Sequence, residues 1–225
     1  MNTRTTPSNA LVSPLIHPGF VPYVTIDQAG VNSFLKAIAV SAVGQAIILA
    51  ALGIKVVAMS MPNMSREPRC KLVLPKGAWV SNLKWMQDEN KRQARFLEMI
   101  CWLISGPVAE FSFDESDHYG DLGLEDIEGS YRFLSAYESA HNVRHDYVLG
   151  GCNFVVERLL GQYYEVAEAM VAHLSAHGSL DEKEIAGYLS CVRVEALGQQ
   201  AMVAFQEPWI EDEADRVHRM FIGVG

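Results

Sequence analysis

Two histidines with the spacing of metal ligands stand in the second half of the chain. His141 and His145 are four residues apart, which would place them one turn apart on a helix face, and His118 and Asp146 could complete a ligand set. The intervening Asn142-Val143-Arg144 offers no general base, and its positive charge would repel a cation. Two histidines without further ligands do not make a zinc site. The pattern therefore favours a solvated turn, with a relocated metal site as the alternative.

A second candidate for chemistry is a cysteine that follows two glycines. Gly150-Gly151-Cys152 could present a nucleophile on a tight turn, with His145 or Asp146 as a helper. A free cysteine more often packs as a small apolar side chain, so we expect Cys152 to be buried and structural. Ser41 is a weaker candidate nucleophile, because it lies in the middle of a predicted helix without a neighbouring base.

The first predicted helix carries a resemblance to a known enzyme family. Its sequence is Ala37-Ile38-Ala39-Val40-Ser41-Ala42-Val43-Gly44-Gln45-Ala46, and Leu52-Gly53-Ile54-Lys55-Val56 follows it. This segment resembles the zinc helix of FtsH-type peptidases, which reads H-E-x-G-H-A and is followed by small residues, a glycine and a strand. Gly44 and Ala46 are in register with that motif.

Three further segments extend the resemblance over residues 34–189. Leu103-Ile104-Ser105-Gly106-Pro107-Val108-Ala109-Glu110 looks like the family's apolar run that ends in G-x-x-A-E. Glu125-Asp126-Ile127 is similar to the element whose aspartate is the family's third zinc ligand. The stretch from His173-Leu174 through Gly178-Ser179-Leu180 to Glu184-Ile185 resembles the family's closing L-x-x-x-x-T-L-x-x-x-E-I pattern. We expect neither the family's ATPase module nor its transmembrane helices.

The residues that carry the family's chemistry are replaced in this chain. In H-E-x-x-H the two histidines bind one Zn²⁺ and the glutamate deprotonates the bound water. Here Ser41 and Gln45 occupy the histidine positions and Ala42 occupies the glutamate position. A hydroxyl and a neutral amide are poor zinc ligands, and alanine cannot act as a base. The substitutions therefore predict no catalytic residue at this position.

Asp126 is the one zinc ligand implied by the resemblance that is retained. A lone carboxylate should not hold zinc, because a structural site gains its binding energy from a full ligand set. Asp126 could equally be an exposed acid in the first turn of a helix, where the helix dipole stabilises it. We expect no cofactor, and zinc only if the alternative below holds.

These observations favour a catalytically inactive, peptidase-like protein, a pseudopeptidase that binds a protein or peptide partner. The cleft predicted for that partner is lined by Ser41, Gly44, Gln45, Glu110 and Asp126. The alternative is an active zinc metallohydrolase with a rearranged site, built from Asp126, His118 and the pair of His141 and His145. The sequence names neither the partner nor the oligomeric state.

An uncharged segment raises the question of a membrane. Residues 37–54 contain no charged side chain, which approaches the length of a spanning helix. Ser41, Gly44 and Gln45 at the centre, and Lys36 and Lys55 at the ends, favour a buried core helix over an inserted one. Insertion of this segment by a small membrane-associated protein is a third interpretation.

The composition of the chain limits the other functional classes to which it could belong. The chain has 225 residues and is 49% hydrophobic, which is enough for one domain with a sizeable core. Its formal charge of -9, without a basic run, argues against nucleic acid as a partner. Cys70, Cys101, Cys152 and Cys191 are far apart and form no C-x-x-C pair, and no signal peptide is visible. We expect a cytoplasmic protein.

The spacing of apolar residues along the chain predicts the fold around these residues. We expect a mostly α (α+β) fold, a helical FtsH-type peptidase-like domain with a small β element. Residues 1–31 are predicted to form an irregular arm, residues 32–204 the domain, and residues 205–225 an acidic tail with a short helix.

Within the domain the pattern predicts helices at 32–53, 85–104, 124–139, 154–177 and 180–189, with strands at 54–61 and 70–74. Gly53 and Gly178 should end helices, and Gly106-Pro107 should interrupt one. Ser179 and Glu182 are predicted to form a capping box.

Overall fold

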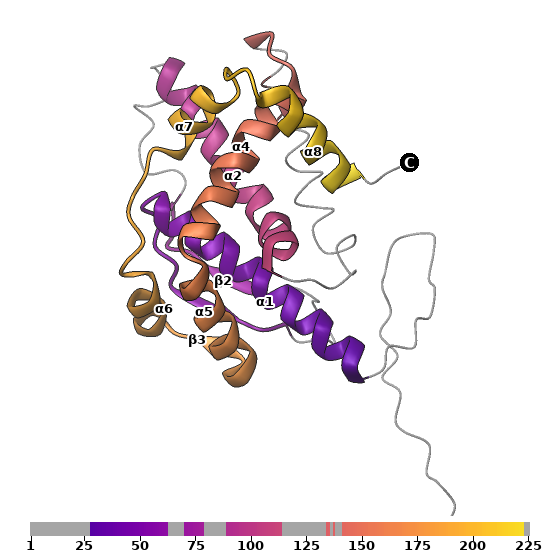
Figure 1. The fold of residues 1–225 in the computed structure, drawn as a ribbon. Coiled ribbons are helices and arrows are strands. Elements are labelled where there is room, and N and C mark those ends of the chain that lie inside the picture. Colours follow the sequence, from indigo (N-terminus) through magenta and orange to yellow (C-terminus); the bar gives the residue numbers. More distant parts are fainter. Residues whose placement is uncertain are drawn as a thin grey trace, which may run out of the picture.

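The computed structural model describes residues 28–62, 70–78, 89–113, 134, 135, 137 and 141–222. In this part of the chain the helices are α1 (Gln28–Ala51), α2 (Glu89–Phe113), α4 (His145–Gln162), α5 (Tyr164–His177), α6 (Glu182–Leu189), α7 (Leu197–Ala204) and α8 (Ile210–Ile222) (Figure 1). The strands are β1 (Ala58–Ser60), β2 (Lys71–Val73) and β3 (Ser179–Leu180). The predicted fold class, mostly α with a small β element, is confirmed.

Helix α1 is the centre of the core. Its side chains from Ala37 onward are apolar on nearly every face, and most of them are fully buried against α2 on one side and α5 on another. The helix begins at Gln28, inside the segment predicted to be an irregular arm. It ends where predicted, because Gly53 adopts a left-handed φ of 72°.

In the part of the chain that the structure describes, two helices are long and apolar enough to cross a membrane. They are α1 over Phe34–Ala51 and α2 over Lys91–Phe113, and 67% and 50% of these stretches are buried inside the protein. The helix at the centre of a protein core meets the same criterion of length and composition.

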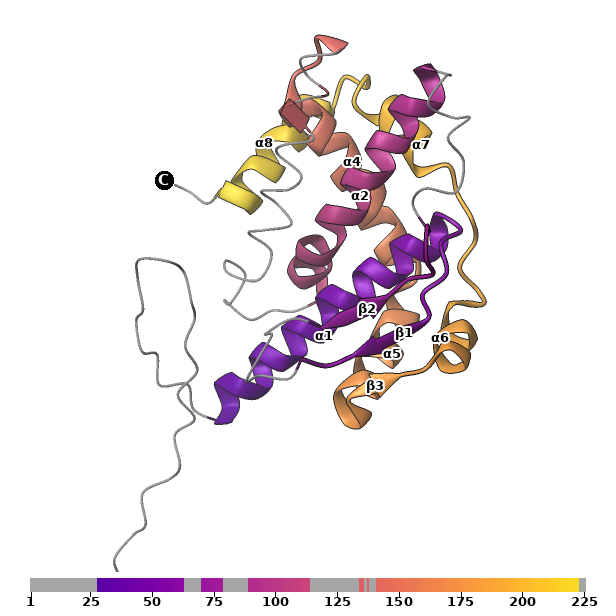
Figure 2. The same ribbon diagram turned by 180° about the vertical axis from the view of Figure 1, so that it is seen from behind.

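The three strands form an antiparallel sheet in the order β2-β1-β3, which lies beside α1 (Figure 2). Ala58 pairs with Val73, and Met59 pairs with both Leu72 and Leu180. Met59 and Leu180 are buried, so the sheet closes one side of the core. The predicted strands at 54–61 and 70–74 contain β1 and β2, whereas the pairing of β3 was not predicted.

Helix α2 contradicts the predicted interruption at Gly106-Pro107. It runs unbroken from Glu89 to Phe113 with Pro107 inside it. A proline in a helix interior removes one backbone donor and costs about 3 kcal/mol. The surrounding side chains, including Ile104, Val108 and Ala109, are fully buried in the core, and their packing offsets that cost.

The predicted single helix at 154–177 is two helices. The helical conformation is interrupted at Tyr163, whose φ of -111° and ψ of 26° are not helical. The apolar periodicity continues across the break because α4 and α5 both bury a face in the same core. Tyr163 is buried, and its hydroxyl accepts a hydrogen bond from the Arg193 backbone N–H at 3.1 Å.

The capping box before α6 lies two residues later than predicted. Ser179 and Leu180 form β3, so Asp181 becomes the N-cap. The Asp181 side chain accepts the Glu184 N–H at 2.9 Å, and Glu184 accepts the Asp181 N–H at 2.8 Å. Gly178, with φ 77°, ends α5 as predicted, and α6 ends at the predicted Leu189.

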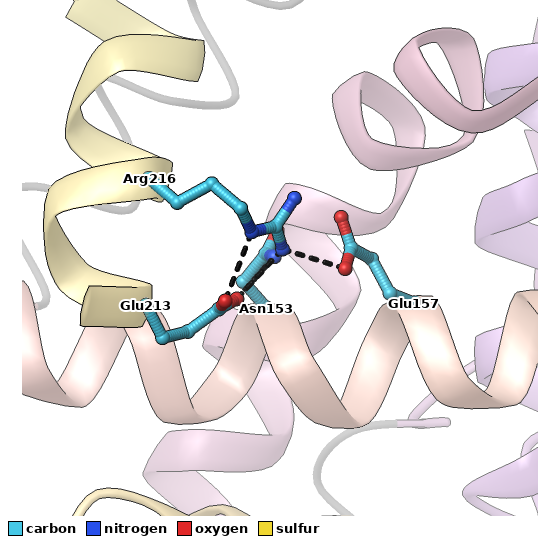
Figure 3. Close-up of polar contacts among 4 residues, drawn as sticks. All are labelled: Asn153, Glu157, Glu213 and Arg216. Atoms are coloured by element: carbon cyan, nitrogen blue, oxygen red, sulfur yellow. Dashed lines mark hydrogen bonds and ion pairs between the residues drawn. The ribbon is translucent and has the colours of Figure 1, made fainter. Parts of the chain in front are cut away.

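The last helix, α8, lies in the segment predicted to be an acidic tail with a short helix, and it packs on the helical body. Both α7 and α8 pack on α4, and Ile210, Ala214 and Val217 of α8 are buried. A polar cluster joins α8 to α4, in which Arg216 lies between Glu157 and Glu213 (Figure 3). Most of the predicted helix at 124–139 lies outside the described residues, as does the predicted arm up to residue 27.

Candidate binding site

The residues in register with the zinc motif lie where α1 crosses α2. A Cβ added to Gly106 would overlap the Ser41 hydroxyl and come within 3.4 Å of Gln45 Nε2. A Cβ added to Gly44 would overlap the Ala109 Cβ and approach the Ser105 carbonyl oxygen to 2.8 Å. The two helices therefore touch backbone to side chain, and the contact requires glycine at both positions.

This crossing accounts for three of the five residues predicted to line a cleft. Gly44 is buried in the helix contact, and Ser41 and Gln45 are half-buried against Gly106. Glu110, one residue beyond Ala109, is also buried. The face of α1 predicted to line a cleft thus packs against α2, and Asp126 lies outside the described residues.

The side chains at the crossing offer little chemistry. Ser41 contributes a hydroxyl and Gln45 an amide, while Ala42 is buried among apolar neighbours. Among the described residues, no three or more His, Cys, Asp or Glu side chains gather in a way that could hold a metal ion. His118, like Asp126, lies outside that part of the chain.

The predicted histidine pair does not form one helical turn. Asn142 has a left-handed φ of 54°, and α4 begins only at His145. The His141 ring lies 4.4 Å from the Tyr137 ring, and its Nδ1 is 3.1 Å from Gln93 Nε2. His145 is exposed at the start of α4.

Asp146, which follows His145 in the chain, forms an ion pair and hydrogen bonds with Arg144. Burial raises the pKa of Asp146, but the Arg144 guanidinium and the Tyr147 backbone N–H outweigh it and hold the pKa below its ordinary value. This carboxylate is therefore committed to its neighbour in the chain.

Cys152 is fully buried within α4, as predicted. Burial, together with the neighbouring Cys101, raises the pKa of the Cys152 thiol well above its ordinary value. A protonated, inaccessible thiol is not a nucleophile. The glycines before it serve packing, because a Cβ on Gly151 would lie 3.0 Å from the Ala201 carbonyl oxygen of α7.

A groove of about 640 Å³ lies beside the crossing, between α1, the C-terminal end of α2, and α5. We call it the α1–α5 groove. It is lined by Leu35, Lys36, Val40, Met61, Pro62, Phe113, Ala167, Glu168, Val171, Ala172, Ser175 and Gly178. Val40 precedes Ser41 in α1, so the groove is lined by a different face of the segment that resembles the zinc helix. Most of its lining is apolar, with Lys36 and Glu168 on facing elements.

Local contacts hold the walls of the groove in place. The Phe113 and Tyr164 rings meet edge to face at 5.1 Å, which ties the end of α2 to the start of α5. The Tyr164 hydroxyl donates to Glu168 at 2.7 Å. The Met61 backbone N–H donates to the Gly178 carbonyl oxygen at 2.8 Å, which fixes the end of α5 beside β1.

Sequence reasoning missed the contribution of α5 to the groove. Glu168, Ala172 and Ser175 lie beside Val171 at helical spacing and form a strip next to the buried face of α5. In the sequence this strip has the composition of an ordinary exposed helix surface. The sequence analysis also did not single out the pair of His173 and His177.

That second histidine pair joins α5 to α6. His173 Nδ1 lies 3.0 Å from the Tyr188 hydroxyl oxygen, and His173 Nε2 lies 3.5 Å from Glu184 Oε1. The His177 ring packs edge to face on His173 at 4.5 Å. The four-residue spacing of His173 and His177 in the sequence is the signal that could have singled them out.

No protein-family model matches this chain, and a search of curated proteins finds no match.

Proposed function

We propose that this chain is a catalytically inactive relative of FtsH-type peptidases that binds a polypeptide segment in the α1–α5 groove. The observation that carries the proposal is the contact between two motifs far apart in the sequence. Gly106, from the segment that resembles G-x-x-A-E, packs on Ser41 and Gln45 at the two histidine positions. Leu180, from the closing pattern, pairs with β1, the strand that follows the zinc-helix segment.

The side chains at the motif support binding without hydrolysis. Ser41 and Gln45 are half-buried neutral groups against α2, and Ala42 is buried and has no proton to exchange. A metallopeptidase needs a metal that acidifies water and a base that takes the proton. These residues supply neither function.

The lining of the groove supports a peptide as the ligand. Its volume of about 640 Å³ and its mostly apolar wall are typical of binding sites that take up large apolar side chains. Lys36 on α1 and Glu168 on α5 add one charge of each sign, which suits the charged groups of a peptide. We therefore propose a segment rich in large apolar residues.

A binding experiment with two matched variants tests this function. A displayed peptide library would supply a ligand, and fluorescence anisotropy would measure its affinity. Ala172→Arg places a long charged side chain in the groove from an exposed position, and we expect it to weaken binding at least tenfold. Ala169→Arg, an exposed position on the same helix outside the groove, should bind like the wild type.

Two outcomes would contradict the proposal. Either no peptide is selected, or Ala172→Arg binds the selected peptide as tightly as Ala169→Arg does. A separate assay with a quenched fluorescent peptide and added Zn²⁺ should give no cleavage. Cleavage that a chelator abolishes would favour the alternative metallohydrolase, in which Asp126, His118, His141 and His145 form the site.

A further inference from the structure

The α1–α5 groove lies close to the point where the chain enters α1. Leu35 and Lys36, which line the groove, belong to the N-terminal half of a helix that begins at Gln28. Residues 1–27 precede that helix and are attached to its first turn. Any ligand in this groove is therefore a neighbour of the chain's own N-terminal segment.

The distance along α1 sets which residues of that segment can reach the groove. Gln28 and Lys36 are separated by about 12 Å, because a helix rises about 1.5 Å per residue. An extended chain advances about 3.3 Å per residue, so about four residues that run back along α1 cover the same distance. With residues 25–27 as the turn, Phe20 and Val21 come beside Leu35 and Lys36.

The sequence at this position has the chemistry proposed for the ligand of the groove. It reads Leu15-Ile16-His17-Pro18-Gly19-Phe20-Val21-Pro22-Tyr23-Val24, which we call the 15–24 segment. The longer stretch 5–26 contains no Lys, Arg, Asp or Glu. An uncharged segment that is rich in large apolar side chains enters an apolar groove without the cost of removing a charge from water.

Two further properties favour binding of this segment. Pro18 and Pro22 disfavour a helix and restrict the backbone to extended conformations, so less conformational entropy is lost when the segment binds. Attachment to α1 through a short linker also gives the segment an effective concentration on the order of 1 mM. A segment whose Kd as a free peptide is about 0.1 mM would then fill the groove roughly nine-tenths of the time.

We infer that the 15–24 segment occupies the α1–α5 groove of its own chain, as an intramolecular ligand that an outside peptide must displace. The inference rests on the proposed function, because it takes the same groove as the site for a polypeptide. It adds a regulation of that site: the resident segment weakens the binding of an outside peptide by about tenfold.

Photo-cross-linking of the full chain tests where the segment lies. Benzoylphenylalanine in place of Phe20 would be irradiated, and the cross-linked peptides would be identified by mass spectrometry. We expect an intramolecular cross-link to residues 35–40 of α1 or residues 167–178 at the α5 wall. Ala172→Arg should lower its yield by about fivefold or more, because a charged side chain then enters the groove. Ala169→Arg, outside the groove, should leave the yield unchanged.

The affinity for an outside peptide tests the regulation. Phe20→Asp should release the segment, because a carboxylate is costly to bury in an apolar groove. Fluorescence anisotropy should then show that the selected library peptide binds about tenfold more tightly than to the wild type. Asn9→Asp adds the same charge outside the 15–24 segment and should bind like the wild type.

Three results would overturn the inference. They are a cross-link that avoids the groove or joins two chains, equal cross-link yields in Ala172→Arg and Ala169→Arg, and an unchanged peptide affinity in Phe20→Asp. The cross-link needs no outside peptide, which separates this inference from the proposed function. If the cross-link forms and no library peptide is selected, the groove holds its own segment and only the proposed outside ligand is refuted. If a library peptide binds and Phe20 cross-links elsewhere, only the inference fails.

Discussion

Gly106 packs so closely on Ser41 that the contact makes a sharp prediction at the scale of single residues. Gly106→Ala should destabilise the protein by about 1–3 kcal/mol, because the new methyl group overlaps the Ser41 hydroxyl in a packed core. With Ser41→Ala in the background that overlap disappears, and the next neighbour is Gln45 Nε2 at 3.4 Å. The same glycine change should then be neutral or stabilising, since alanine favours helix by up to about 1 kcal/mol.

Urea unfolding of the single and double variants measures this coupling. Gly161→Ala in α4 is the control, because nothing lies within 4 Å of a Cβ there and the change should stabilise the helix. Equal effects of Gly106→Ala with and without the Ser41 hydroxyl would show that the two residues are not in contact.

Glu195 makes a second prediction at this scale, in the dependence of stability on pH. Burial raises the pKa of Glu195, but hydrogen bonds from Arg158 and Gln200 outweigh it and hold the pKa below its ordinary value of 4.5. A carboxyl whose pKa is depressed on folding stabilises the protein above its unfolded pKa, and that contribution is lost as pH falls through the folded pKa.

Unfolding free energies measured from neutral pH to below the ordinary glutamate pKa should therefore fall less steeply for Glu195→Gln than for the wild type. Glu165→Gln, on an exposed stretch of α5, should follow the wild type. Parallel curves for the wild type and Glu195→Gln would contradict this assignment.

Between elements, the polar cluster of Asn153, Glu157, Glu213 and Arg216 holds α8 on α4 (Figure 3). Arg216 donates from Nη2 to Glu157 at 2.6 Å and to Glu213 at 2.7 Å, and buried Asn153 donates to Glu213 at 3.0 Å. Arg216→Met leaves two carboxylates facing each other without their shared cation. It should cost about 1–2 kcal/mol, at the lower end of the range for charged hydrogen bonds because Arg216 is partly exposed.

Hydrogen exchange resolved by segment tests the role of this polar cluster. Arg216→Met should accelerate exchange in α8 while α5 keeps its protection. Arg219→Met, an exposed arginine on the same helix, should leave both unchanged. Uniform acceleration across the protein would show that α8 does not open on its own.

The ends and breaks of the helices show how much of the fold could be predicted from the sequence. Gly53 and Gly178 end helices because they reach φ angles that other residues avoid, a local property that sequence reveals. Pro107 did not break α2, and Tyr163 did break the helix predicted to run through it. Both outcomes depend on packing with distant segments, which no local pattern records.

For the molecule as a whole, the α1–α5 groove could not be predicted because three helices and the end of β1 build it. The sequence singled out residues 37–46 and residues 103–110 as segments that resemble motifs of one family, but did not show that they are in contact. It could not show that Ser41 and Gln45 face α2 while Val40, the next residue, faces the groove. The spacing of residues in the sequence shows which side chains share a face of a helix, but not which other element covers that face.

The burial of α1 leads to a prediction for the whole molecule. Its apolar side chains are covered by α2, α5 and the sheet, so they should not need lipid. We therefore expect the chain, expressed without detergent, to stay in the supernatant after ultracentrifugation. Recovery only in the membrane pellet would favour the interpretation in which residues 37–54 insert.

The proposed absence of zinc chemistry is tested by the metal content of the purified, untagged chain. The protein would be incubated with equimolar Zn²⁺, passed through gel filtration, and measured by inductively coupled plasma mass spectrometry. Ser41, Ala42 and Gln45 predict a zinc content near zero, because none of them is a zinc ligand. One tightly held zinc per chain would contradict this account.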